Sequence, residues 1–460
     1  MLPRFRHQKR VLENGLRVVT VEPPHLHVAT LVVYAKVGSR YETARDNGLS
    51  HFVEHMLFRG TKRYPSSFAL NFAIEELGGT LYAETGRDYS LYQISLDPEL
   101  IGEGIALLGE IFGAPAFTQL EVERQIVLEE INEDLDESGR DINLDDLARR
   151  TAFPDHPLGQ KITGPIDNVE RFALRDVKRH FARFYGASNL ILCVSGPIDA
   201  GQVVRAAKRR LGTLPSGQPA ATLPPQEMAD GPRFAYVESP GAQTAVQVLF
   251  RALPEPHPDY VALQALSRVL DDGMSTRLHY RLADQAGLAY YVNASIEPFH
   301  DTAQFEVDGA AAHAKFAELL AGILGLLDEL CEVPVSEKEL AKAKRRHRLE
   351  LRAAFDDVDA MAGWFGGTEL FYEPPSYEEK VARMETVSPE DIQRVAQAVF
   401  LPERLTIAAA GGLSSRQRRE AERVVKEWRR TSAAGRQVWT ARPTATRAAA
   451  RRVPAPRPSR

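Results

Sequence analysis

The chain has 460 residues, of which 44% are hydrophobic and 26% are charged, and its formal net charge is −5, as in an ordinary globular protein. Two cysteines are too few for a cysteine metal site, and without a run of about 18 apolar residues we expect no transmembrane helix and no membrane partner. The segment from Met1 to Glu22 lacks the apolar stretch of a secretory signal, so we expect a cytoplasmic protein, or a periplasmic one if a leader was removed.

The segment from His51 to His55 reads His-Phe-Val-Glu-His and carries the strongest chemical signal in the chain. Histidines four residues apart lie one turn apart on the same face of a helix, close enough to bind one metal ion. Glu54 lies near that face, where it could activate a water molecule at the metal. Chance would produce this pattern in roughly one chain in fifty, so it needs support from the rest of the sequence.

A hydrolytic zinc site usually has three protein ligands, so the third must come from outside this segment. Residues 122–133 have helical periodicity and several glutamates. Glu123 and Glu130 are seven residues apart, about 10 Å along a helix, so only one of them could touch the metal. The residues alone do not separate Glu129, Glu130 and Glu133, because an acidic helix is more often a solvated face.

Acidic residues continue beyond this helix, with nine acids and one arginine in residues 129–146. Either the stretch is a solvated face, or part of it lines a cavity that favours basic peptides. Upstream, residues 78–85 and 88–92 are predicted to form a two-stranded hairpin.

The sequence contains an internal repeat about 215 residues apart. In each copy a helix, an apolar strand ending in glycine and a second helix follow one another. The first copy is at residues 174–184, 189–197 and 202–211, and the second is at 389–399, 404–412 and 418–428. The chain is therefore predicted to consist of two related α/β halves. Cys193 and Cys331 lie in apolar segments and are expected to be buried thiols.

These patterns predict four regions, with a linker rich in Pro and Gly between the halves. They are an N-terminal domain at 1–215, the linker at 216–230, a C-terminal domain at 231–430 and a basic tail at 431–460. The tail has seven arginines and no acids, and we expect it to be disordered and do not expect nucleic acid as a partner. In the second half, residues 266–272 align with 49–55 and have Arg268 and Asp272 in place of the histidines. The helix therefore does not need histidines to fold.

The chain resembles the pitrilysin family of inverzincin metallopeptidases, most of all the branch with the mitochondrial processing peptidase β subunit and its bacterial relatives. The matching segments are 12–19, 48–61, 123–130, 156–159 and 287–290. The resemblance implies an α+β fold of two homologous α/β domains that form half of a clamshell. Each domain would hold a mixed, largely antiparallel sheet packed with helices.

The resemblance also implies a zinc-dependent endopeptidase subunit with one Zn²⁺ per chain. His51, His55 and Glu130 would bind the zinc, Glu123 would support it, and Glu54 would act as the general base. Peptides would bind in extended form along the strand at 78–85, although Tyr82 stands where an asparagine is common in the family.

Active members of the family also use an arginine and a tyrosine, seven residues apart in the C-terminal half, to hold substrate. Tyr290 matches the tyrosine, but Ala283 stands at the arginine position and Arg281 is two residues away. We therefore expect a heterodimer with a related subunit that carries the pair, enclosing the substrate in a chamber, with a homodimer as the alternative. A non-catalytic scaffold or a peptide-binding subunit of the same fold is the alternative function.

Overall fold

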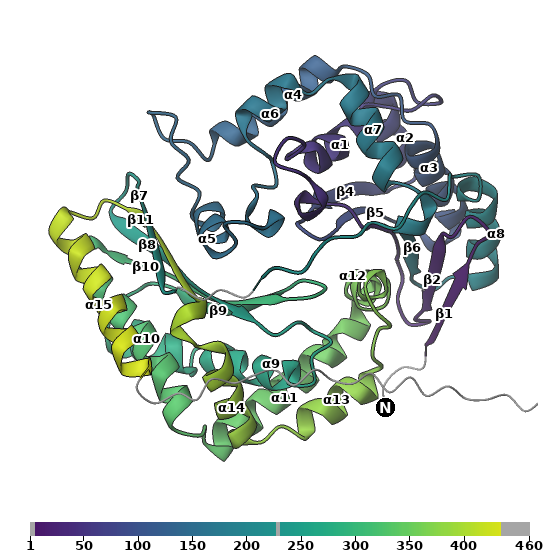
Figure 1. Cartoon of the computed structure of the whole chain (residues 1–460). Coiled ribbons are helices and arrows are strands. Elements are labelled where there is room, and N and C mark those ends of the chain that lie inside the picture. Colours follow the sequence, from purple (N-terminus) through teal and green to yellow (C-terminus); the bar gives the residue numbers. More distant parts are fainter. Residues whose placement is uncertain (1–4, 227–230, 434–460) are drawn as a thin grey trace, which may run out of the picture.

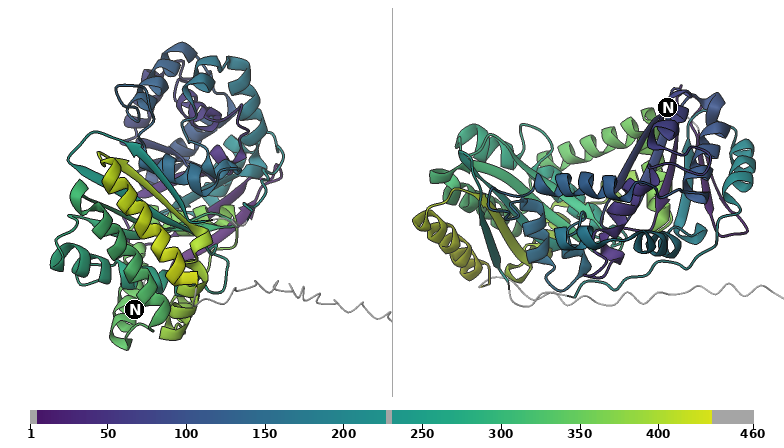
Figure 2. Two further views of the ribbon diagram at one scale, coloured as in Figure 1. Left: turned by 60° about the vertical axis from the view of Figure 1, so that its left-hand side comes forward. Right: turned by 90° about the horizontal axis from the view of Figure 1, so that it is seen from above.

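The structure is a computed structural model that describes residues 5–226 and 231–433. It contains two β-sheets, one in each half of the chain, with most helices packed on their outer sides (Figures 1 and 2). The predicted α+β class with two mixed, largely antiparallel sheets is confirmed. Within the described ranges, no helix is both long and apolar enough to cross a membrane.

The first sheet has six strands, of which only β2 and β6 are parallel neighbours. All its other neighbouring pairs are antiparallel. In spatial order the strands are β1 (Arg6–Val11), β2 (Arg17–Glu22), β6 (Leu190–Ser195), β3 (Ala29–Ala35), β5 (Ser90–Leu96) and β4 (Thr80–Thr85).

The second sheet has five strands and the same pattern, with one parallel pair, β7 and β11. In spatial order they are β7 (Arg233–Glu238), β11 (Leu405–Gly411), β8 (Gln243–Ala252), β10 (Ala303–Ala312) and β9 (Val292–Pro298). This order corresponds to β2, β6, β3, β5 and β4 of the first sheet. The repeat predicted from the two apolar strands is therefore a repeat of the whole sheet.

Each half builds its own apolar core between its sheet and its helices. The first half contains α1 (Leu49–Leu57), α2 (Ser67–Glu75), α3 (Ile101–Gly113), α4 (Leu120–Asn132), α5 (Leu144–Ala152), α6 (Ile166–Arg171), α7 (Leu174–Phe184) and α8 (Ala200–Leu211). The second contains α9 (Tyr260–Leu270), α10 (Phe316–Glu332), α11 (Glu337–Ala353), α12 (Val358–Ala362), α13 (Tyr377–Glu385), α14 (Pro389–Val399) and α15 (Ser415–Ala433).

The helix α5 of the first half packs against the second sheet rather than its own (Figure 1). Its small residues Ala148 and Ala152 lie in one buried cluster with Leu249 of β8 and Ala408 of β11. Arg149, also on α5, pairs with Glu306 of β10 at 2.6 Å. The N-terminal end of α5, with its two aspartates, is thereby held between the halves.

The second half likewise contacts the sheet of the first half, because α12 and the following helical turn at residues 363–367 pack on the first sheet. Trp364 and Phe365 bury against Tyr34 of β3 and Cys193 of β6. Cys193 and Cys331 are both buried and no disulfide joins them, as expected.

The described part of the predicted linker, residues 216–226, contains neither helix nor strand. The basic tail was expected to begin at residue 431, but α15 continues to Ala433. No glycine or proline interrupts the chain before Gly435, which explains the longer helix. Residues 227–230 and 434–460, and with them most of the tail prediction, lie outside the described residues. The domain boundaries stay predictions.

Candidate metal centre

The helix α1 begins at a position that only glycine fills without strain. Gly48 precedes it with φ of 100°, and a Cβ there would lie 2.6 Å from the carbonyl oxygen of Thr163. The buried carboxylate of Glu42 accepts hydrogen bonds from the backbone N–H groups of Gly48 and Ser50. An anion at this end of the helix is favoured by the helix dipole. Gly48 and Glu42 together fix where α1 starts.

The helix α1 buries an apolar face and presents a polar one. Its apolar residues enter the first core, and they are Leu49, Phe52, Val53, Met56 and Leu57. His51, Glu54 and His55 recur at spacings of three and four residues, so they share the opposite face. This face points towards α4 and towards the edge strand β4.

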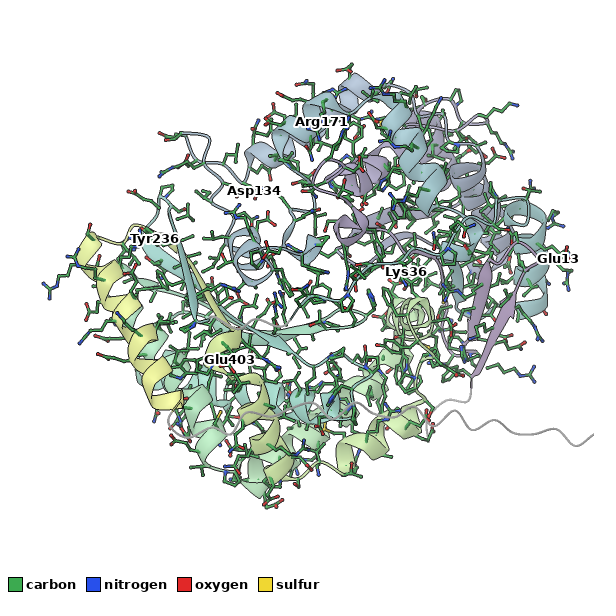
Figure 3. All side chains as sticks on the ribbon, viewed as in Figure 1. Glu13, Lys36, Asp134, Arg171, Tyr236 and Glu403 are labelled. Carbon is green, nitrogen blue, oxygen red and sulfur yellow. The ribbon has the colours of Figure 1, made fainter. Side chains whose placement is uncertain are left out.

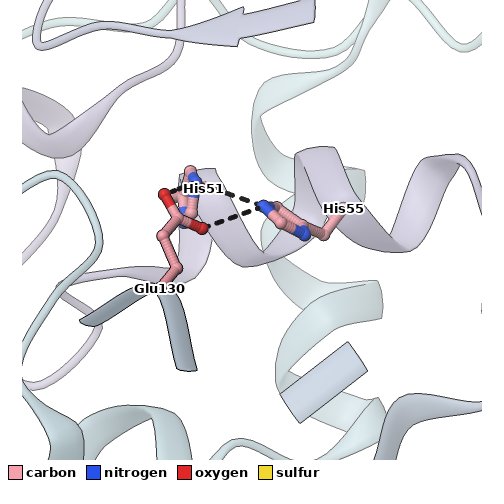
Figure 4. A group of neighbouring side chains, drawn as sticks. All are labelled: His51, His55 and Glu130. Carbon is pink, nitrogen blue, oxygen red and sulfur yellow. Dashed lines mark hydrogen bonds and ion pairs between the residues drawn. The ribbon is translucent and has the colours of Figure 1, made fainter. Parts of the chain in front are cut away.

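His51, His55 and Glu130, the set that the family resemblance implied, converge in the structure (Figure 4). The two Nε2 atoms are 3.2 Å apart, and they lie 3.4 and 3.5 Å from the carboxylate oxygens of Glu130. Zinc bonds to His nitrogen and carboxylate oxygen are about 2.0–2.2 Å long, so neighbouring ligands in a tetrahedral site are about 3.3–3.5 Å apart. The donor set and its spacing therefore fit a zinc ion.

Glu130 is the one acidic residue of α4 that faces both histidines. Hydrogen bonding with the His51 and His55 rings holds the pKa of its carboxyl well below its usual range. Glu129 on the same helix and Glu133, directly after its last residue, are exposed. The sequence left three glutamates open as the third ligand, and the side of α4 that faces α1 identifies Glu130 as the candidate.

Glu123, one of the residues predicted to support the site, lies behind His55. It is 4% exposed, and its Oε1 accepts a hydrogen bond of 2.8 Å from Nδ1 of His55. Its other oxygen pairs with the guanidinium of Arg59. A carboxylate on the far nitrogen of a metal-binding histidine fixes the tautomer and orientation of the ring. Glu123 can orient His55 in this way.

We predict that Glu123→Gln weakens zinc binding by roughly 10–100-fold, the usual cost of losing such a carboxylate. Glutamine can still accept the hydrogen bond from His55. It carries no negative charge, however, so it cannot stabilise a positive charge on that ring or form an ion pair with Arg59. Competition with a fluorescent zinc chelator measures the affinity. The exposed Glu121→Gln, on the same helix, is the control and should bind zinc as the wild type does. Unchanged affinity of Glu123→Gln would show that Glu123 only fills space.

Glu54 lies beside the histidines without joining their triangle. Its carboxylate accepts a hydrogen bond from the hydroxyl of Thr85, at the end of β4. Burial raises the pKa of the Glu54 carboxyl, while Thr85 and the histidines act in the opposite direction. A carboxylate with a raised pKa is a better proton acceptor and donor near neutral pH. The position suits the predicted role of a general base.

The site opens into a cavity of about 480 Å³. Two basic residues, Arg87 and Lys161, line the cavity. Six carboxylates also line it, and they are Glu54, Glu84, Glu130, Asp134, Asp145 and Asp146. Part of the acidic stretch at 129–146 therefore faces the cavity, whereas Glu137 is exposed. Figure 3 labels Asp134 where the chain leaves α4 towards α5.

Three residues of this site were missed from the sequence. Arg59 follows His55 by four residues, so the helical spacing could have indicated it. Thr85 and Lys161 have no such signal, because they come from β4 and a distant loop. Lys161 lies 2.7 Å from Asp134 and 3.5 Å from Asp146, and so offsets part of the acidic wall.

The structure does not bring Tyr290 to the zinc cavity of its own chain. Its side chain is 91% exposed, in the loop before β9, and it does not line the cavity. Arg281 pairs with Glu329 of α10, and Ala283 lies in the same helical segment, His279–Gln285. In the second half Arg268 and Asp272 form an ion pair of 2.8 Å. The aligned positions there carry no histidine pair.

Two family models match the sequence. Residues 17–166 match the insulinase family of peptidases, M16, and residues 171–346 match the inactive domain of peptidase M16. The chain belongs to peptidase family M16. This is the pitrilysin family, as the motifs implied.

The M16 relatives resemble this chain over nearly its whole length. A zinc protease of Streptomyces coelicolor is 29% identical over 89% of this chain and 90% of its own. A probable mitochondrial-processing peptidase subunit beta of Schizosaccharomyces pombe is 28% identical over 87% of this chain and 90% of its own. The crystal structure of a Helicobacter pylori protease matches with a TM-score of 0.81 and 25% identity, over 89% of this chain and 100% of that one.

Proposed function

We propose that the chain is the catalytic subunit of a zinc-dependent endopeptidase that cleaves peptides or unfolded segments bound in extended form. The observation that carries this proposal is the triangle of His51, His55 and Glu130, with the buried carboxylate of Glu54 next to it. Zinc proteases among the M16 relatives support the same chemistry. Zinc analysis of the purified protein, together with cleavage of a quenched peptide by the assembled enzyme, tests it.

Each of these residues has a separate role in the proposed reaction. When bound at His51, His55 and Glu130, zinc supplies a Lewis acid that polarises the scissile carbonyl and lowers the pKa of water. Glu54 accepts the proton of the attacking water and donates it to the leaving amine. Thr85, which donates a hydrogen bond to Glu54, holds the carboxylate in place.

The edge strand β4 supports binding of an extended peptide. It is the last strand of its sheet, and no other strand in the described ranges pairs with its outer edge. Ala83, Glu84 and Thr85 of this strand line the zinc cavity. A peptide that pairs with β4 would therefore run past the zinc residues, through backbone hydrogen bonds that need little side-chain identity. The surplus of carboxylates in the cavity favours peptides with basic residues.

We further propose that a second, related subunit completes the site. Tyr290 lies outside the zinc cavity of its own chain, and Ala283 stands where active relatives are expected to have an arginine. A partner subunit with both residues would enclose the peptide between two chains. The mitochondrial-processing peptidase subunit beta among the relatives agrees with a role as one subunit of a larger enzyme.

We predict that the purified chain alone cleaves a quenched peptide at a rate near that of the buffer, even when fully loaded with zinc. The physical reason is the missing arginine, since orientation of substrate supplies a large share of a rate enhancement. Adding the partner that co-purifies from the native cell should restore cleavage. Robust cleavage by the chain alone would exclude the heterodimer but not the zinc chemistry.

A further inference from the structure

A second cavity, of about 360 Å³, lies between the two halves and shares no lining residue with the zinc cavity. Side chains alternate along a strand, so Tyr34 and Leu91 point to the face of the first sheet that α12 covers. Val33 and Tyr92 point to the opposite face, which packs on α1. The cavity is therefore on the other side of the sheet from the histidines.

The walls of this cavity combine aromatic rings with carboxylates. Its aromatic residues are Tyr34, Tyr89, Phe299, Phe371 and Tyr372, and its carboxylates are Asp88, Glu255 and Asp359. No lysine or arginine lines it, and the ring of His300, which does, pairs with Asp88 and Asp301. Its size lies within the range of about 300–1,000 Å³ that small-molecule sites occupy, and such sites also pair apolar walls with a few polar groups.

Glu255 is the half-buried carboxylate of this wall whose charge no ion pair in the described part of the chain offsets. Asp88 is neutralised by Arg40 at 3.1 Å and also accepts from the N–H of His300 at 2.8 Å. Glu255 accepts a hydrogen bond from the neutral hydroxyl of Tyr372. Neither Glu255 nor Asp359 forms an ion pair within the described part of the chain. Asp359 is exposed to solvent, so the uncompensated charge within the cavity is that of Glu255.

Besides Arg40, two lysines lie near the cavity, each over an aromatic ring. Lys36, labelled in Figure 3, has its ammonium 5.7 Å from the ring centre of Phe371, and Lys380 lies 4.6 Å from that of Trp364. Neither lysine lines the cavity. Phe371 lines the cavity, so one ring of its wall already has a cation over it, and the other rings remain for a ligand.

The hydroxyl of Tyr34 offers a hydrogen-bond acceptor to a polar ligand. Tyr34 is 6% exposed and lines the cavity, yet its hydroxyl makes no hydrogen bond with any described residue. This oxygen keeps some contact with solvent in the cavity, so it can still accept a hydrogen bond. An ammonium N–H that enters the cavity could donate to this oxygen.

We propose that this cavity binds a small organic cation, an ammonium group carried on an aromatic or apolar body. The rings would contact the body and attract the charge by cation–π interaction. Glu255 would balance the charge, and the Tyr34 hydroxyl would accept a hydrogen bond. Because the lining comes from both halves, the ligand would bridge them.

Isothermal titration calorimetry of the full chain with phenylpropylamine tests the proposal, and phenylpropanol is the neutral ligand of the same shape. The amine should bind saturably and at least about tenfold more tightly than the alcohol, as expected for a desolvated charge on aromatic rings. Equal affinity of the two compounds, or no saturable binding of the amine, overturns the proposal. The readout is heat of binding, so it does not depend on peptidase activity.

Two variants locate the binding. Gly363 lines the cavity with helical φ and ψ, and a Cβ there would meet nothing within 4 Å, so Gly363→Leu fills the cavity without strain. It should abolish binding of the amine. Gly325→Leu is the matched control, since Gly325 is a helical glycine with equally open space on the exposed side of α10, and it should bind normally.

Tyr34→Phe keeps the ring and removes only the hydroxyl that lacks a partner. It should weaken binding of the amine by about threefold to tenfold, the usual value of one hydrogen bond, and leave the melting temperature of the free protein unchanged. Binding that survives Gly363→Leu in a variant with a normal melting temperature places the amine elsewhere and contradicts the proposal.

Discussion

Replacing Glu54 by glutamine is expected to leave zinc bound and to lower peptide cleavage by roughly 10²–10⁴-fold, the usual contribution of a general acid–base residue. Glutamine has nearly the same shape and can still accept the hydrogen bond from Thr85, but it cannot take a proton from water. The measurement is the rate of quenched-peptide cleavage by the variant assembled with its partner, with zinc content determined by mass spectrometry.

The matched control for this variant is Glu84→Gln. Glu84 lines the same cavity and bonds to the hydroxyls of Tyr82 and Tyr89 rather than to the residues on α1. It should therefore keep most of kcat, while KM for basic peptides rises because one cavity carboxylate is lost. If Glu54→Gln cleaved peptides at the wild-type rate, the assignment of the base would be wrong. If the assembled wild-type enzyme bound zinc and peptide but did not cleave, the alternative of a non-catalytic subunit would hold.

Local signals in the sequence predicted the helices and the repeat well. The predicted helices at 174–184 and 389–399 agree with α7 and α14 residue for residue. Each has an amphipathic pattern, and Ser388 caps the second, accepting a hydrogen bond from the backbone N–H of Asp391. The segment from His51 to His55 could also be interpreted from the sequence, because both histidines and Glu54 belong to a single helix and their spacing defines a shared face.

What the sequence did not predict depends on contacts between distant segments. Nothing in the composition of α5 indicates that Ala148 and Ala152 pack on the sheet of the other half, since small residues suit any close helix–sheet contact. The same holds for Trp364 and Phe365, which could have filled a core in their own half. The packing of α5 on the other half matters for function because α5 brings Asp145 and Asp146 to the zinc cavity.

Glu130→Gln is expected to lower the zinc affinity by more than about 100-fold and to abolish cleavage. Removal of a residue that only orients a ligand costs about 10–100-fold, and loss of a direct ligand costs more. The neutral amide is also a poorer ligand for zinc than a carboxylate, and it leaves His51 and His55 without the charge that now lies 3.4 and 3.5 Å from their Nε2 atoms. Chelator competition and zinc content of the dialysed protein measure the effect.

Glu129→Gln and Glu133→Gln are the matched controls, and they test the choice that the sequence alone left open. Each removes one negative charge from the same segment, but both side chains are exposed. A general field effect of the acidic stretch would lower zinc affinity in all three variants by similar, salt-dependent amounts. If Glu130 is a direct ligand, only Glu130→Gln should show a large loss of zinc affinity, and salt should not change that loss. Retention of zinc by Glu130→Gln would require a different third ligand.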